Sequence, residues 1–263
     1  MVNWLKEEVN QLAMTQQKRN IIITGGNSGM GRAMAEAFAR TGSQIAIIGR
    51  DQDTLRDTAE ALTPHVSWYQ ADVSQRKQVQ ITVANIVEQW GHVDVLINAA
   101  GFVRGVTTDM PLEEAESEWD AVIDTNLKGS FLMTVAVAPY LVRPGGRIIY
   151  ISSIAAFTGG SRAGSTAYAA AKAGVLGLTY GFARELSSQG ITVNAVAPGF
   201  IANTGFTGAW SEERIRGIIE QTPAGRGGHV NDIAAAVLYL ASPEASFVTG
   251  EVLNVNGGWL FGH

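Results

Sequence analysis

A tyrosine and a lysine lie four residues apart in the segment Tyr168-Ala-Ala-Ala-Lys172, fifteen residues after Ser153. The alanines between them are strong helix formers, and residues four apart lie on the same face of a helix. A lysine ammonium beside a phenol favours the phenolate, which lowers the pKa of the tyrosine. The pair therefore predicts a tunable proton donor, although the same spacing also occurs by chance on many surface helices.

A glycine-rich turn, Thr24-Gly-Gly-Asn-Ser-Gly-Met-Gly31, follows the first predicted strand and opens a helix. Glycines permit a tight turn, and the N-terminus of the helix presents amide donors and a positive dipole end to a pyrophosphate. An ordinary connection between a strand and a helix is the alternative. The strand before the turn and the helix after it favour a dinucleotide site.

Predicted strands and helices alternate along the chain and position these motifs. Several of the strands consist of consecutive apolar residues, which is typical of strands buried on both faces. The predicted strands are 20–24, 44–48, 66–70, 93–98, 146–152, 191–196 and 251–255, and the predicted helices are 30–40, 52–61, 75–90, 119–141, 167–188 and 231–241. This alternation predicts an α/β fold, a doubly wound (Rossmann), mainly parallel seven-stranded sheet with helices on both faces in a single domain.

Two segments lie outside this alternation. Residues 1–18 precede the first strand and are expected to be an N-terminal extension, so that the dinucleotide-binding domain covers residues 19–263. Residues 200–222 form a long insertion after the sixth strand, and such insertions are often substrate lids or binding loops. A plain surface loop is the alternative for this segment.

Composition excludes several classes of function. The formal net charge of −5 provides no broad basic surface, so neither nucleic acid nor an anionic membrane is expected as a partner. The chain has no cysteine, which excludes disulfides, thiolate catalysis and cysteine zinc sites, and its four histidines are not at metal-ligand spacing. We therefore expect no metal, and a cytoplasmic location.

Further motifs follow in a fixed order: Asn98-Ala-Ala-Gly101, Asn126 in Asn-Leu-Lys-Gly-Ser-Phe, Ser153, Tyr168-x-x-x-Lys172 and Pro198-Gly199. With Gly25-x-x-x-Gly29-x-Gly31, this ordered set resembles the short-chain dehydrogenase/reductase family from about residue 20 to Gly258. The resemblance implies an oxidoreductase that reduces a ketone or other carbonyl to a secondary alcohol, reversibly, by hydride transfer from a nicotinamide cofactor.

The resemblance also implies a role for each catalytic residue. Tyr168 is the proton donor in reduction, and Lys172 lowers its pKa and holds the nicotinamide ribose. Ser153, favoured over its neighbour Ser152, hydrogen-bonds the substrate oxygen as charge develops there. Asn126 positions a water in a proton relay from Lys172.

The cofactor contacts implied by the resemblance lie in the glycine-rich turn, at the carboxyl ends of strands and after the sixth strand. They are Gly25, Asn27, Ser28, Gly29, Met30, Gly31, Arg50, Asp72, Val73, Asn98, Ala99, Gly101, Tyr168, Lys172, Pro198, Gly199, Ile201, Asn203 and Thr204. Asp72 has a second interpretation, as a helix cap or a turn residue with Ser74. Asn203 and Thr204 are alternatives for one contact.

The end of the second strand indicates which cofactor is preferred. An acidic side chain there, about 20 residues past the glycine turn, would bind the ribose 2′-hydroxyl of NAD. This chain has Gly49 and then Arg50, whose guanidinium can pair with a 2′-phosphate. Asp51 or Asp53 is better placed to cap the following helix. NADP(H) is therefore the predicted cofactor, with NAD(H) possible and Arg50 as a plain surface residue the alternative.

The substrate is not readable from the motifs. Five aromatic residues are candidates for an apolar pocket: Phe102, Phe157, Phe200, Phe206 and Trp210. They favour an apolar or aromatic ketone, whereas the resemblance also admits a 3-oxoacyl thioester, a steroid or a sugar. The alternatives are an NAD-dependent sugar, polyol or hydroxysteroid dehydrogenase and a non-catalytic dinucleotide-sensing protein. The resemblance further implies a homotetramer, paired through the predicted helices 119–141 and 167–188.

Overall fold

The computed structural model describes residues 18–62, 64–202, 204–205, 207–208 and 210–262. The predicted extension, apart from Lys18, lies outside the described residues, as do Asn203 and Phe206. Within the described part of the chain, no helix has both the length and the apolar character needed to cross a membrane.

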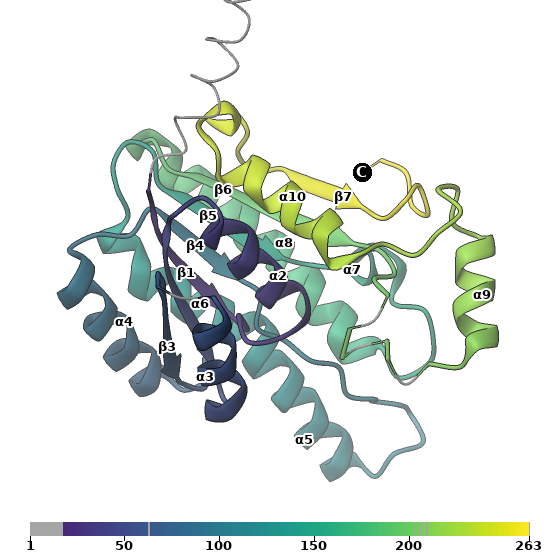
Figure 1. Ribbon diagram of the computed structural model, residues 1–263. Coiled ribbons are helices and arrows are strands. Elements are labelled where there is room, and N and C mark those ends of the chain that lie inside the picture. The colour runs from purple at the N-terminus through teal and green to yellow at the C-terminus, as the bar shows by residue number, and fades with distance from the viewer. Residues whose placement is uncertain (1–17, 63, 203, 206, 209, 263) are drawn as a thin grey trace, which may run out of the picture.

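Seven parallel strands form one sheet in the order β3-β2-β1-β4-β5-β6-β7 (Figure 1). The strands are β1 Asn20–Thr24, β2 Gln44–Gly49, β3 Val66–Gln70, β4 Val95–Asn98, β5 Arg147–Ile151, β6 Thr192–Pro198 and β7 Val252–Val255. Their apolar residues alternate between two buried clusters, so that Ile22 packs on one face and Ile21 and Ile23 pack on the other. The predicted fold class is confirmed.

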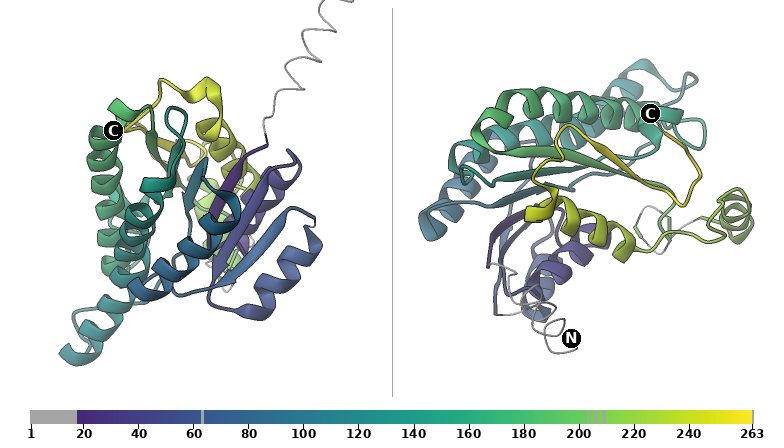
Figure 2. Two further views of the ribbon diagram at one scale, coloured as in Figure 1. Left: turned by 90° about the vertical axis from the view of Figure 1, so that its left-hand side faces the viewer. Right: turned by 90° about the horizontal axis from the view of Figure 1, so that it is seen from above.

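Helices cover both faces of the sheet (Figure 2). The helices are α2 Gly29–Ala39, α3 Gln52–Ala61, α4 Arg76–Trp90, α5 Leu112–Ile123, α6 Gly129–Val137, α7 Ala155–Thr158, α8 Thr166–Leu186, α9 Glu212–Glu220 and α10 Val230–Ala241. Helices α4, α6 and α8 bury apolar residues on one face, and α2, α3 and α10 bury theirs on the other. Helix α9 stands apart from the sheet, within the predicted substrate segment.

The predicted helix over 119–141 requires correction. Helix α5 already begins at Leu112, where Pro111 is the N-cap and Glu113 and Glu114 occupy the first turn, and acidic residues there are favourable to the helix dipole. A π-helical turn, Asp124–Lys128, then separates α5 from α6. A helical turn of the 3-10 type, Ala138–Tyr140, follows α6.

The sheet brings the predicted site residues to one edge. The strand order reverses between β1 and β4, and ligands of doubly wound sheets bind at the carboxyl ends of the strands at such a point. There the Thr24 hydroxyl oxygen accepts hydrogen bonds from the backbone amides of Ala99 and Ala100, both at 3.0 Å. The ends of β1 and β4 are therefore held together beneath the glycine-rich turn.

Candidate active site

The glycine-rich turn has no room for side chains at two positions. Gly25 has a φ of +68°, and a Cβ on Gly31 would lie 2.0 Å from the Gly25 carbonyl oxygen. Helix α2 begins within this motif, at Gly29. Its N-cap is Ser28, whose side chain forms no capping hydrogen bond, and its first turn contains no acidic residue. The first amides of α2 are therefore suited to an anionic group.

A cavity of about 560 Å³ opens beside the turn. It is lined by predicted cofactor residues from four separate segments, namely Gly25, Asn27, Ser28, Arg50, Asp72, Val73 and Gly101. The Asp72 carboxylate also accepts a hydrogen bond from the Ser74 amide at 2.9 Å, so its turn role is present as well. Asn98 is buried, and its side-chain amide donates to the Thr134 hydroxyl at 3.3 Å.

Arg50 lies exposed at the rim of this cavity, with its guanidinium carbon 5.4 Å from the centre of the Phe102 ring. Arg104 approaches the same ring at 5.5 Å, but its guanidinium forms an ion pair with Glu118 at 2.9 Å. Arg50 has no ion pair with any residue that the structure describes. Phe102 was predicted in the substrate pocket, whereas the structure places it in this cavity.

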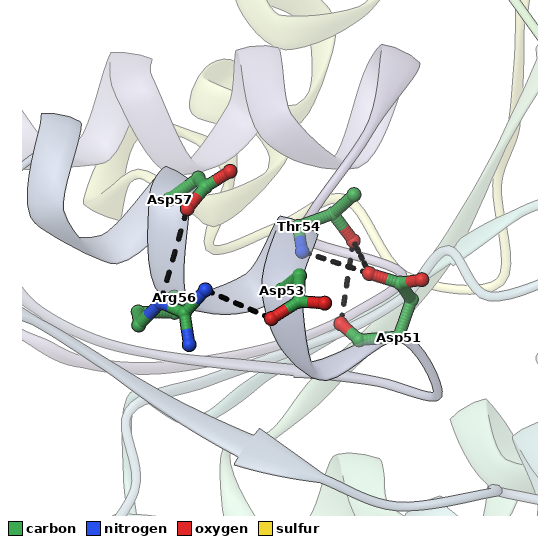
Figure 3. Close-up of polar contacts among 5 residues, drawn as sticks. All are labelled: Asp51, Asp53, Thr54, Arg56 and Asp57. Carbon is green, nitrogen blue, oxygen red and sulfur yellow. Dashed lines mark hydrogen bonds and ion pairs between the residues drawn. The ribbon is translucent and has the colours of Figure 1, made fainter.

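Asp51, the acidic residue that follows Arg50 in the sequence, caps the N-terminus of helix α3 (Figure 3). The Asp51 carboxylate accepts hydrogen bonds from the Thr54 amide at 2.8 Å and the Thr54 hydroxyl at 2.7 Å, and these bonds hold the pKa of Asp51 below its usual value. Asp51 is therefore the N-cap of α3. The sequence had predicted that either Asp51 or Asp53 caps this helix. Asp53 instead pairs with Arg56 at 2.8 Å.

A second, smaller cavity of about 190 Å³ lies at the ends of β5 and β6 and next to α8. Predicted residues that line it are Met30, Ser153, Tyr168, Pro198, Gly199, Phe200, Ile201, Thr204 and Trp210. Phe157 is not among the lining residues and packs against the core on the α8 face of the sheet. Trp259, Arg162 and Arg214 also line the cavity and were not predicted as single residues, although Arg214 lies in the predicted substrate segment 200–222.

The two adjacent serines have different partners. The Ser152 hydroxyl is buried and donates to the backbone carbonyl of Lys172 at 2.9 Å, which fixes α8 on the end of β5. Ser153 Oγ accepts from the Ala155 amide at 3.1 Å and is hydrogen-bonded to the Tyr168 side chain. The geometry therefore brings Ser153, the favoured serine, to the phenol.

Burial shifts the pKa values of Tyr168 and Lys172 in opposite directions. It raises the pKa of Tyr168 to about 12, and the hydrogen bond with Ser153 offsets this only in part. It lowers the pKa of Lys172 to about 8. The Lys172 ammonium donates to the Ile151 carbonyl at 2.8 Å and lies 5.6 Å from the centre of the Tyr168 ring.

Lys172 was expected to lower the pKa of Tyr168, but the net shift of this pKa is upward. In this structure the loss of water around the phenol is the largest effect, and the phenol is therefore protonated at neutral pH. A protonated phenol is the form that a proton donor requires.

Asn126 lies in the π-helical turn and is completely buried. Its side-chain amide donates to the carbonyls of Phe102 at 3.0 Å and Val122 at 2.9 Å, whereas its Oδ1 accepts no hydrogen bond from the described residues. A Cβ on Gly101 would lie 2.4 Å from this oxygen and 3.5 Å from Lys172 Nζ. Gly101 therefore leaves the Asn126 amide and the Lys172 ammonium close together.

The reversal of strand order, the glycine turn and the Ser153–Tyr168–Lys172 cluster define a protein of the dinucleotide-binding α/β class. Comparison with known proteins gives its family. A family model described as Enoyl-(Acyl carrier protein) reductase matches residues 25–260. The 3-oxoacyl-[acyl-carrier-protein] reductase FabG of Thermotoga maritima is 39% identical over 241 residues, which are 90% of this chain and 96% of that protein.

Two further similarities cover the whole domain. The 3-oxoacyl-[acyl-carrier-protein] reductase FabG of Salmonella typhimurium is 38% identical over 246 residues, which are 93% of this chain and 98% of that protein. A solved structure from Brucella melitensis, described as a short-chain dehydrogenase/reductase (glucose/ribitol dehydrogenase), has a TM-score of 0.86 at 32% identity and covers 93% of this chain and 97% of its own. The chain belongs to the short-chain dehydrogenase/reductase family and is an oxidoreductase.

Proposed function

We propose that this protein reduces a ketone to a secondary alcohol with NADPH, reversibly, and that Tyr168 donates the proton. The observation that carries the proposal is the contact of the Ser153 and Tyr168 side chains at a cavity that also contains Pro198 and Gly199. Both hydroxyls can donate to one oxygen atom, as a carbonyl oxygen that gains negative charge requires.

The cofactor site fits a dinucleotide. The turn at Gly25 and Gly31 excludes side chains, the first amides of α2 are uncapped by side chains, and Asn126 Oδ1 is a buried acceptor near Lys172. The bound nicotinamide supplies the hydride. The protein's own residues hold the phosphates at α2, orient the ribose at Lys172, and keep the proton on Tyr168 until the substrate oxygen accepts it.

Arg50 supports the choice of NADPH. Its guanidinium has no ion pair among the described residues, and the neighbouring carboxylate of Asp51 caps α3. A guanidinium recognises a phosphate better than a hydroxyl because charge-assisted hydrogen bonds are stronger than neutral ones.

For the substrate we propose a 3-oxoacyl thioester. Curated relatives are 3-oxoacyl-[acyl-carrier-protein] reductases, whereas the family model is described by reduction of an enoyl group. Two hydroxyls that meet at one point favour an oxygen as the proton acceptor, and hence reduction of the C=O bond over the C=C bond. The apolar aromatic walls at Phe200 and Trp210 suit the acyl part.

The test follows NADPH consumption with 3-oxoacyl thioesters and simple ketones. Tyr168→Phe keeps the ring and removes the proton donor, so turnover should fall by roughly 10²–10⁴-fold while NADPH binding by calorimetry persists. Tyr239→Phe changes an exposed tyrosine on α10 that lines neither cavity and is the matched control. Near-normal turnover of Tyr168→Phe between about pH 6 and 9 would show that another group supplies the proton.

We also propose a homotetramer. Helices α6 and α8 expose Phe131, Val135 and Tyr180, and Gly177 and Gly181 have open space where a side chain would be. Exposed apolar residues beside glycines allow helices of two subunits to approach closely. Light scattering at micromolar concentration should give four times the chain mass of 27.9 kDa, and a monomer mass would contradict the proposal.

A further inference from the structure

Two arginines line the smaller cavity, one between Ser153 and Tyr168 in the sequence and the other well after them. Arg162 lies in the loop between α7 and α8, and Arg214 lies in α9. Arg162 is exposed and Arg214 is half-buried. Neither forms an ion pair with a carboxylate of the residues described here.

Arg214 is held in place by contacts that leave its charge uncompensated. Its guanidinium carbon lies 3.6 Å from the centre of the Trp210 ring, which stacks on Phe200 at a centroid distance of 5.5 Å. Its Nη2 donates to the Ser161 hydroxyl at 3.0 Å. A guanidinium has five N–H donors, and stacking on an aromatic ring orients them without neutralising the charge.

The two positive charges act on each other. Burial is the larger cause and repulsion from Arg162 the second cause of a lowered pKa of Arg214, although an arginine remains protonated at physiological pH. Two like charges at one cavity are unfavourable unless an anion binds to them. A bound anion would gain from both guanidinium groups and would relieve their repulsion.

We propose that the substrate of this site carries a carboxylate or phosphate group that binds Arg162 and Arg214 while its carbonyl reaches Ser153 and Tyr168. This inference rests on the proposed ketone reductase function. The cavity lining also includes large apolar side chains, namely Ile218 and Trp259 in addition to the aromatic pair already described. The anionic group belongs either to a free oxo acid or to the phosphate of a thioester's carrier arm.

The substrates in the test share one 3-oxoacyl group. They are a neutral thioester, an analogue with a carboxylate at its far end, and a thioester whose arm carries a phosphate. For at least one of the two anionic substrates, kcat/KM of the unaltered protein should be roughly 10-fold or more above the value for the neutral thioester. One charge-assisted contact is expected to have an effect of this size. Preference for the phosphate indicates a carrier arm, and preference for the carboxylate indicates a free oxo acid.

The variants Arg162→Gln and Arg214→Gln should each lower the anionic-to-neutral ratio of kcat/KM by roughly 10-fold, through KM, because binding to a non-reacting part of the substrate is lost. Arg216→Gln removes the same charge from an exposed position of α9 that does not line the cavity, and should leave the ratio unchanged. Salt should also lower the ratio, since a rise to about 0.15 M shortens the Debye length to roughly 8 Å.

A ratio near one in the unaltered protein, or a ratio that both variants retain, overturns this inference. Reduction of the neutral thioester in the same experiment would still uphold the ketone reductase function, so the two failures are separate. If the unaltered protein reduces none of the three substrates, the proposed function and this inference fail together.

Discussion

Replacing Lys172 by methionine tests whether a buried ammonium lies beside Tyr168. The side chain is 5% exposed, and burial lowers its pKa from the usual 10.5 to about 8. Methionine is an unbranched side chain that adapts to a long, narrow site and carries no charge. The variant should therefore lose a specific dependence of stability on pH.

The sign and size follow from proton linkage. Between pH 8 and 10.5 the unfolded chain keeps the Lys172 proton while the folded chain has lost it, so the free energy of unfolding rises with pH across this window. A shift from 10.5 to about 8 corresponds to about 3 kcal/mol in all. Of this, roughly 2 kcal/mol should appear between about pH 7 and about pH 9.5.

The measurement is urea unfolding of the unaltered protein and of Lys172→Met at several pH values in this range, at one protein concentration. As the pH rises, the free energy of unfolding of the unaltered chain should increase by roughly 2 kcal/mol relative to that of Lys172→Met. The pKa of Tyr168 is raised to about 12, so this group adds no such change below its unfolded value near 10. Lys77→Met, at an exposed lysine, is the control and should show no trend.

A pH-independent difference between Lys172→Met and the unaltered protein would refute the reasoning. It would mean that the ammonium keeps its charge at high pH, through solvent access or through an acceptor stronger than the Ile151 carbonyl. A larger destabilisation of Lys172→Met at low pH than at high pH would contradict even the direction, since it would require a raised pKa of Lys172 in the folded state.

Two further substitutions separate structure from chemistry. Ser153→Ala should reduce turnover by roughly 10²-fold, because one hydrogen-bond donor to the substrate oxygen is lost. Ser152→Ala should mainly lower the free energy of unfolding, measured with urea, by about 1 kcal/mol, because the Ser152 hydroxyl donates to the Lys172 carbonyl. Arg50→Gln should lower the ratio of NADPH to NADH affinity, measured by calorimetry, by roughly 10-fold; a ratio already below one in the unaltered protein would contradict the assignment. It is a cleaner test than Gly49→Asp, because a Cβ on Gly49 would approach Asn27 Oδ1 to 2.7 Å.

The sheet was predictable because several of its strands are marked by a run of consecutive apolar residues in the sequence. The run Ile21-Ile22-Ile23 is apolar throughout, and each isoleucine does pack into one of the two cores. The glycine turn likewise had a local signal, since Gly25 adopts a positive φ and Gly31 packs on it. Such requirements depend on neighbours in the sequence, so one chain is enough to recognise them.

The break between α5 and α6 was not predictable in this way. Asn126 donates to Val122 within the helix but also to Phe102, 24 residues earlier, and the π-helical turn accompanies this tertiary contact. An apolar pattern over 119–141 contains no sign of it. The early start of α5 was readable, because Pro111 followed by two glutamates is a helix start signal.

The walls of the smaller cavity were predicted only in part, because aromatic residues indicate burial without indicating where. Phe200 and Trp210 line the cavity, whereas Phe102 lies at the cofactor side and Phe157 packs in the core. Arg214 lies in the predicted substrate segment, but its place at the cavity depends on the stacking of its guanidinium on Trp210, which no motif indicates.

The opposite pKa shifts of Tyr168 and Lys172 have one main cause, the loss of water around both side chains. Burial keeps the phenol neutral and weakens the hold of the lysine on its proton. Negative charge that develops on a carbonyl oxygen between Ser153 and Tyr168 would stabilise the nearby ammonium and would draw the proton from the phenol. In the reverse direction Tyr168 must start as the phenolate. We therefore expect alcohol oxidation to become faster relative to reduction as the pH rises.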